Sequence, residues 1–101
     1  MGNRVLLQEI LENLLGSGNV YFQPPSNVDL EYPCIIYERS NSETIFADNK
    51  PYMYQLAYKI TVIDQDPDSE ILDKVASLPM CVFDRHYIAG NLNHDVYIIY
   101  Y

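Results

Sequence analysis

The strictest constraint on the fold is a two-residue alternation in the middle of the chain. Between residues 52 and 62, large apolar side chains take every second position, and the intervening residues include Gln55, Lys59 and Thr61. The apolar positions are Tyr52, Tyr54, Leu56, Tyr58, Ile60 and Val62. Because successive side chains of a strand point to opposite faces, the pattern predicts one long strand over residues 52–64 with one face on a hydrophobic core.

Two other segments have the spacing of amphipathic helices. Residues 4–15 place apolar residues at positions 7, 10, 11 and 14, and Gly16 ends this pattern. A second helix is expected to start at Asp66 and Pro67, because an acidic cap, a preset φ angle and further acids in the first turn all favour a helix start there. Its buried face is expected to consist of Ile71, Leu72, Val75 and Ala76.

Shorter strands are expected at residues 20–22, 34–38, 81–88 and 96–101, with a turn over residues 89–94 joining the last two. Residues 39–51 are rich in Ser, Asn and charge and are expected to form a projecting loop or arm. Together the elements predict a single domain, residues 1–101, of the α+β class. We expect a mostly antiparallel sheet of about four to five strands with two helices packed on one face.

The charge of the chain narrows the classes of partner. The 101 residues include fourteen Asp and Glu against six Lys and Arg, a formal net charge of -8. Proteins that grip nucleic acid or anionic membranes rely on Lys and Arg, so neither partner is expected, and no apolar run has the roughly 18 residues of a membrane span. With no signal-peptide pattern at the start, we expect assembly in a cytoplasm. The ten tyrosines suit strands and contacts between subunits.

Metal sites are not expected. Asp64, Asp66 and Asp68 have the spacing of a calcium loop, but Ser69 stands where that loop needs Gly, and Val75 where it needs a bidentate Glu. Acidic capping of the following helix explains the same aspartates.

Catalysis is not expected either. Cys34 and Cys81 lie in apolar runs typical of core thiols, and neither pairs with His86 or His94 at a metal-ligand spacing. There is no nucleophile elbow or Gly-rich phosphate loop. The sequence therefore predicts a non-enzymatic protein with no catalytic, cofactor-binding or metal residues.

Four stretches together resemble a known family. The first stretch, Val20–Pro25, follows the first helix and is an aromatic strand that enters a Pro-rich stretch, and the second is Tyr32–Tyr37. The third is the long strand Tyr54–Ile63, which runs into a helix started by Asp and Pro, and the fourth is the ending Leu92–Tyr101. This order and these motifs resemble the tail-terminator and tail-completion proteins of long-tailed bacteriophages, with a fold like that of the lambda tail terminator. The resemblance covers nearly the whole chain.

The resemblance implies a role in virion assembly. It implies a small subunit that forms a ring, typically a hexamer, at the head-proximal end of the tail tube, stops tube polymerisation and docks the tail to the head. The expected partners are further copies of the chain, the tail tube protein, and the head connector or a head-completion protein. The resemblance implies that DNA passes through such a ring without sequence-specific binding. Alternatives are another neck or head-completion/adaptor protein, or a small acidic inhibitor that mimics DNA.

Within this reading, Ile45, Phe46 and Tyr52 are candidates for contacts with another subunit or partner, although a loop folded back on its own core explains the first two equally well. Asp66, Asp68 and Glu70 are candidates for acids facing a channel, where they would repel DNA; a solvated helix start is the alternative explanation. The Tyr-rich strands could also extend a sheet between subunits, but the sequence does not indicate which strand is the edge.

Overall fold

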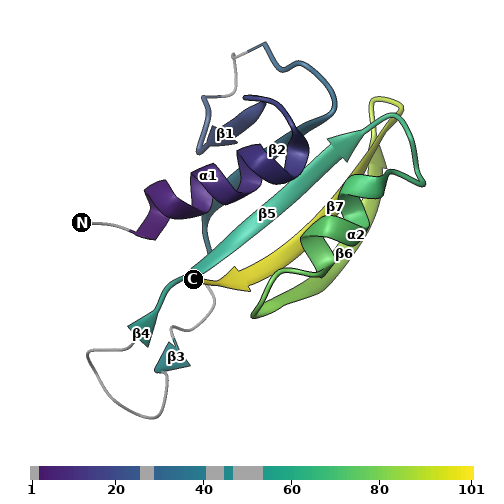
Figure 1. Cartoon of the computed structure of the whole chain (residues 1–101). Coiled ribbons are helices and arrows are strands. Elements are labelled where there is room, and N and C mark those ends of the chain that lie inside the picture. Colours follow the sequence, from purple (N-terminus) through teal and green to yellow (C-terminus); the bar gives the residue numbers. More distant parts are fainter. Residues whose placement is uncertain (1–2, 26–28, 41–44, 47–53) are drawn as a thin grey trace.

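The computed structural model describes residues 3–25, 29–40, 45–46 and 54–101. Its elements are α1 (Asn3–Leu15), β1 (Val20–Phe22), β2 (Cys34–Arg39), β3 (Ile45–Phe46), β4 (Tyr54–Gln55), β5 (Ala57–Asp64), α2 (Glu70–Ala76), β6 (Cys81–Ala89) and β7 (Leu92–Tyr100). Five strands form one sheet in the order β1-β2-β5-β7-β6, and β3 and β4 form a separate pair (Figure 1). Only the β1–β2 pairing is parallel among the described strands, so the predicted α+β class with a mostly antiparallel sheet is confirmed.

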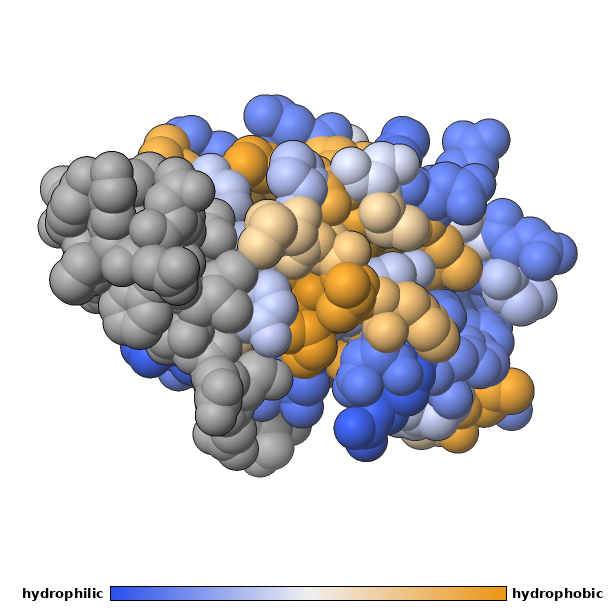
Figure 2. Space-filling view, turned by 90° about the horizontal axis from the view of Figure 1, so that it is seen from below, coloured by the Kyte–Doolittle hydropathy of each residue, from blue (hydrophilic) through white to orange (hydrophobic). Residues whose placement is uncertain are grey.

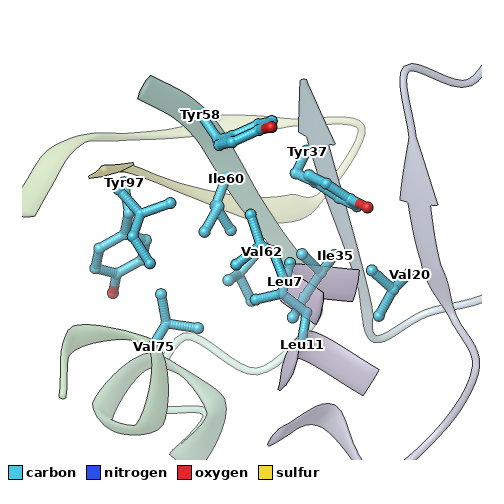
Figure 3. Packing of buried hydrophobic residues seen from close by; sticks show 11 residues of the cluster. Leu7, Leu11, Val20, Ile35, Tyr37, Tyr58, Ile60, Val62, Val75 and Tyr97 are labelled. Carbon is cyan, nitrogen blue, oxygen red and sulfur yellow. The ribbon is translucent and has the colours of Figure 1, made fainter. Parts of the chain in front are cut away.

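One hydrophobic cluster joins the helices to the sheet. Alternate residues of the inner strands enter it, and in Figure 1 both helices lie in front of these strands. The buried members are Leu7, Leu11, Val20, Ile35, Tyr37, Tyr58, Ile60, Val62, Val75, Tyr97 and Ile99. Figure 3 shows Leu7 and Leu11 of α1 beside Ile35 and Val62, with Val75 of α2 pointing towards Tyr97. Burial of these side chains is the main stabilising term of the fold.

The single long strand predicted over residues 52–64 is wrong in its first part. β4 ends at Gln55 and pairs with β3, while β5 begins at Ala57 and pairs with β2 and β7. Between them, the backbone of Leu56 exchanges two hydrogen bonds with Tyr101, at 2.9 and 3.4 Å. The alternation correctly indicated an extended backbone. It did not indicate that the chain changes its pairing from β3 to β2 and β7 at Leu56.

Most of the arm expected over residues 39–51 lies outside the described residues, but two parts of it are described. Arg39 still belongs to β2, where it pairs with Tyr58. Within the segment that was predicted to be a loop, Ile45–Phe46 forms strand β3. This strand is too short to show a two-residue alternation, so the sequence pattern could not reveal it.

The second helix begins later than predicted. Asp66 and Pro67 precede it, and the N-cap is Ser69, whose side chain accepts a hydrogen bond from the N–H of Ile71. The carboxylates of Asp64 and Asp66 instead accept the backbone N–H two residues on, at 3.0 and 2.9 Å. Short polar side chains form such turns as readily as they cap helices, and here Asp64 and Asp66 form turns instead of the helix cap.

The C-terminal hairpin is tighter than the predicted turn over residues 89–94. β6 and β7 are joined by Gly90 and Asn91 alone, both with positive φ, 59° and 64°. Two successive residues of positive φ match the right-handed twist of a hairpin, and Gly and Asn adopt them at the lowest cost. β7 therefore begins at Leu92 and spans nine residues. Among the described helices, none has the length and apolarity needed to cross a membrane.

Candidate interaction surface

The long free edge of the sheet is β6. It pairs with β7 on one side and has no described strand on the other. The side chains of its four large apolar residues are exposed to these extents: Val82 58%, Phe83 56%, Tyr87 45% and Ile88 68%. Soluble proteins usually shield a long edge strand, because its unpaired N–H and C=O groups can pair with another chain. This exposed apolar edge is therefore the candidate interaction surface of the molecule.

Apolar exposure on β6 extends to both faces of the sheet. By alternation along the register with β7, Phe83 and Ile88 lie on the face that carries the helices, and Val82 and Tyr87 lie on the opposite face. A bulge between Phe83 and Arg85 adds one residue to β6. On the helix face, the seven-residue α2 leaves Phe83 and Ile88 exposed.

Other large apolar side chains also reach the surface. Figure 2 looks at the molecule from below and shows hydrophobic residues gathered in the middle of that face, among hydrophilic ones. Outside β6 the exposed large apolar residues are Val5, Leu6, Tyr32 and Met80. An apolar cavity of about 200 Å³ lies between α1, the segment after α2 and the end of β7, and Met80 lines it. Of these surfaces, only β6 combines apolar side chains with a strand edge.

A polar hollow lies on the sheet face opposite the helices. It has a volume of about 420 Å³ and is lined by Glu38, Arg39, Ser40, Lys59, Asp84, Arg85 and Ile98. Lys59 and Ile98 alternate with core residues of β5 and β7, which places the hollow on this face. Of the six Lys and Arg residues of the chain, Lys59 and Arg85 meet on this face, whereas Arg39 pairs with Tyr58 of the core and its side chain lies on the helix face.

The charges on this face of the hollow form two ion pairs. Lys59 Nζ lies 3.5 Å from Glu38 Oε2, and Arg85 Nε lies 3.0 Å from Asp84 Oδ2. With two cations and two anions on this face, the hollow carries no formal net charge within a chain of -8.

The three acids predicted to face a channel lie together on the surface. Asp66, Asp68 and Glu70 are all exposed, between the end of β5 and the first residue of α2. None of them forms an ion pair with another described residue. Their surroundings are those of a solvated helix start, and the structure of one chain does not test whether they line a channel.

Of the predicted contact residues, Ile45 and Phe46 form β3, which pairs with β4. Tyr52 lies outside the described residues. The structure thus brings the first two together on one short strand and leaves their role in subunit contacts a prediction.

The cysteine and histidine side chains have surroundings typical of residues with a structural role. Burial raises the pKa of the Cys34 and Cys81 thiols to about 11, and the charge of Asp64 adds to the effect at Cys34. His86 Nε2 lies 3.2 Å from Asn93 Oδ1, and His94 stacks on the ring of Tyr87. Within the described residues, no three His, Cys, Asp or Glu side chains are grouped to hold a metal ion.

Sequence reasoning missed both the edge and the hollow. The missed residues are Lys59, Val82, Phe83, Arg85, Tyr87 and Ile88. One signal was available for β6: the polar run Asp84-Arg85-His86 interrupts its apolar residues, and charged residues within a strand are typical of an edge. No comparable signal marks the hollow, because its basic residues come from different strands.

A scan against protein-family models gives no match to this chain, and searches of curated proteins and of solved structures give none either.

Proposed function

We propose that this protein is a structural, non-enzymatic subunit of a bacteriophage virion that assembles with copies of itself into a ring at the head–tail junction and acts as the tail terminator. The observation that carries the proposal is the exposed apolar edge of β6. A nine-residue edge strand can add a strand from a neighbour through main-chain hydrogen bonds, while its apolar side chains become buried.

A second copy of the chain is the occupant that this edge fits best. Among the described strands, the sheet ends in β6 on one side and in the three-residue β1 on the other. Contact between unlike surfaces of identical subunits is head-to-tail, and head-to-tail contacts generate closed rings when the rotation between subunits closes. Pairing of β6 with its own copy would instead give a two-fold dimer.

The sequence resemblance supplies the particular role. The element order on which it rests, an N-terminal helix, two strands, a long strand, a helix and a hairpin, agrees with α1, β1, β2, β5, α2, β6 and β7, with the short strands β3 and β4 between β2 and β5. In this proposal the ring, by family resemblance a hexamer, stops polymerisation of the tail tube protein and docks the tail to the head connector or a head-completion protein.

Negative-stain microscopy of the protein mixed with tail tubes of the same virus tests the proposal. Wild-type protein should form rings on one end of each tube and stop further growth. The variant Val82→Lys/Ile88→Lys should leave tube ends uncapped, because it places two charges on the edge that a neighbour must cover. Its circular dichroism should match the wild type, since both side chains are exposed.

The matched control is Val5→Lys/Leu6→Lys on α1, which adds the same charge at apolar side chains that are 49% and 53% exposed. This control should still cap tubes. Loss of capping in both variants, or in neither, would contradict assembly through β6.

The same preparation separates the alternatives. A different neck or head-completion protein would form rings that bind the head connector but leave tube growth unaffected. An acidic DNA mimic would remain a monomer or dimer and bind a basic partner with an affinity that falls steeply with salt. Rings on tube ends are expected only of a terminator.

A further inference from the structure

The part of β6 next to the C-terminal turn presents main-chain groups to the outside of the sheet. Ala89 and Leu92 flank the two-residue turn and are partners in the register, and such a pair exchanges main-chain hydrogen bonds. Because main-chain direction alternates along a strand, Tyr87 also faces β7, whereas His86 and Ile88 turn their N–H and C=O groups outwards. No strand among the described residues pairs with these outward-facing groups.

Two features limit the strand that can pair there. A bulge between Phe83 and Arg85 shifts the ladder by one residue, and Gly90, with a φ of 59°, begins the turn at the other end. A strand added in one uninterrupted register therefore covers residues 85–89 and meets two outward-facing residues.

β1, on the other side of the sheet, has an outer edge of matching length (Figure 1). The N–H of Ile35 in β2 donates to the Asn19 C=O at 3.0 Å, and by alternation Tyr21 also faces β2. Val20 and Phe22 therefore face outwards. The three-residue β1 thus offers two outward-facing residues, as many as the part of β6 beyond the bulge.

We propose that β1 of a second copy of this chain adds to β6 as an antiparallel strand over residues 85–89, with Tyr21 opposite Tyr87. The inference rests on the self-assembly proposed above, and it names the strand that the edge receives and the register of the pairing. Repeated around the assembly, the contact joins the five-stranded sheets of successive subunits into one continuous sheet.

In this register the outward-facing residues of the two strands meet as hydrogen-bonded pairs. His86 lies opposite Phe22, and Ile88 lies opposite Val20, so each pair exchanges two main-chain hydrogen bonds. The Val20 C=O already accepts a hydrogen bond from Gln8 Nε2 at 3.1 Å. A carbonyl oxygen has two lone pairs, so it can accept the Ile88 N–H of the neighbour as well.

Strand direction agrees with a ring. β6 is antiparallel to β7, β7 to β5 and β5 to β2, while β1 is parallel to β2. β6 and β1 therefore run in opposite directions within one subunit. A neighbour related by rotation about an axis along the strands keeps these directions, so its β1 meets β6 in the antiparallel sense and its helices stay on the same side of the joined sheet.

Apolar side chains meet on both faces of the joined sheet. Val20 and Phe22 pack in the core cluster on the helix face, so Tyr21 points to the opposite face, where Tyr87 also lies. Aromatic pairs across an antiparallel ladder are favourable. On the helix face the exposed Ile88 gains Val20 as a neighbour.

Disulfide formation between two copies tests the register. A non-hydrogen-bonded pair such as Tyr21 and Tyr87 brings its Cα atoms to about 4.5 Å, which is within disulfide range. Under mild oxidation, an equimolar mixture of the Tyr21→Cys and Tyr87→Cys variants, free at high concentration or bound to tube ends, should give a linked dimer with one chain of each. Within one subunit the two positions lie four strand spacings apart, about 19 Å, so the link reports contact between copies.

The matched control places the second cysteine on the other side of the bulge. Val82 is exposed on the same face as Tyr87, and Val82→Cys mixed with Tyr21→Cys should give no link. Wild-type protein, which holds Cys34 and Cys81, measures the background. A link in the Tyr87→Cys variant alone would show β6 paired with its own copy, and a link through Val82→Cys would show another register. Either result overturns the inference.

A proline variant separates main-chain pairing from side-chain contact. His86→Pro removes the N–H that the Phe22 C=O of the second copy accepts, and it spares the bonds to β7 because His86 faces outwards. It should weaken self-association in sedimentation velocity by about tenfold or more, whereas His86→Ala keeps the N–H and should associate like the wild type. Circular dichroism of both variants should match the wild type. Equal association of the two variants overturns strand addition at this position.

The outcomes distinguish this inference from the proposed function. Rings on tube ends without a link between positions 21 and 87 overturn the inference and leave the proposed function intact. A link between these positions without rings on tube ends supports the strand pairing and overturns the proposed function. Wild-type protein that forms no rings, together with variants that form no link, overturns both.

Discussion

β5 and β6 are similar strands with different surroundings. β5 has eight residues and β6 has nine, and each carries Val, Ile and Tyr as well as charged residues. In β5 every residue is buried or half-buried, whereas in β6 every residue after Cys81 is exposed. β5 lies between β2 and β7 in the middle of the sheet, and β6, at the edge, has β7 as its one partner among the described strands. The local composition of the two strands does not explain the difference; the number of neighbours does.

This difference shows how one sheet can carry both stability and assembly. An inner strand buries its side chains within the subunit and contributes to the free energy of unfolding. An edge strand with the same residue types leaves its apolar side chains exposed, so that a partner can bury them. If the comparison holds, substitutions in β5 should act on folding and substitutions in β6 on association.

The largest expected effect is on core burial. Ile60→Ala in β5 should lower the free energy of unfolding by about 2–5 kcal/mol, because it leaves a cavity at a fully buried position. Ile88→Ala removes the same atoms from β6 and should change the free energy of unfolding by less than about 0.5 kcal/mol. Urea unfolding of both variants at a concentration where the protein is monomeric gives the two values. Equal losses of unfolding free energy in the two variants would contradict the distinction between the inner strand β5 and the edge strand β6.

The two thiols probe where the exposure of β6 begins. With a pKa of about 11 instead of 9.0, the Cys34 and Cys81 thiols should react with a disulfide reagent at pH 8 about a hundredfold more slowly than an exposed cysteine, because the thiolate is the reactive form. Single Cys→Ser variants assign each rate. Fast reaction at Cys81 would show that the exposed part of β6 includes its first residue.

The same pKa shifts have a consequence for stability. The folded state holds each thiol proton more tightly than the unfolded state, so stability should be constant below about pH 8 and fall as the pH rises from the unfolded to the folded pKa. The Cys34→Ser variant should lose less stability over this interval than the wild type.

The turn that holds β6 against β7 gives a smaller effect. Gly90→Ala should lower the free energy of unfolding by about 1 kcal/mol, because φ of 59° is unfavourable for a residue with a Cβ. Gly18→Ala is the control: a Cβ there meets nothing within 4 Å and the φ of Gly18 is not in the positive region. Thermal unfolding of the two variants compares them, and equal changes would argue against the two-residue turn.

The smallest expected effect concerns Asp95 of β7, which pairs with His86 of β6. Burial raises the pKa of this carboxyl, and the nearby His86 and His94 partly oppose the rise. A raised pKa favours the folded state at low pH, and this contribution is lost as the pH rises through the folded pKa. Asp95→Asn should therefore gain a few tenths of a kcal/mol at pH 7 and flatten the acidic part of the pH profile. A loss of stability at pH 7 would mean that the histidines outweigh burial.

Much of the secondary structure followed from local patterns. The spacing of Leu7 and Leu11 predicted α1, and the alternation of Tyr58, Ile60 and Val62 predicted the buried face of β5. The errors have a common cause. The change of partner at Leu56, the cap at Ser69 and the start of β7 at Leu92 all depend on which segments meet in space, and a local pattern does not contain that information.

The candidate surface was less predictable than the fold. The sequence offered Asp66, Asp68 and Glu70 through their crowding in one segment, and the structure shows them exposed together. It did not offer the hollow, since Lys59 and Arg85 are far apart in the sequence and meet only through the pairings of β5, β7 and β6.

The sequence by itself therefore determined which segments are extended or helical, because backbone preference and side-chain periodicity are local properties. It also determined an acidic chain without a catalytic motif. Only the tertiary structure decided that β6 is the long free edge and that Lys59 and Arg85 meet at one hollow. Strand order arises from contacts between residues distant in the sequence, and two strands with like residues differ only in how many neighbours the sheet gives them.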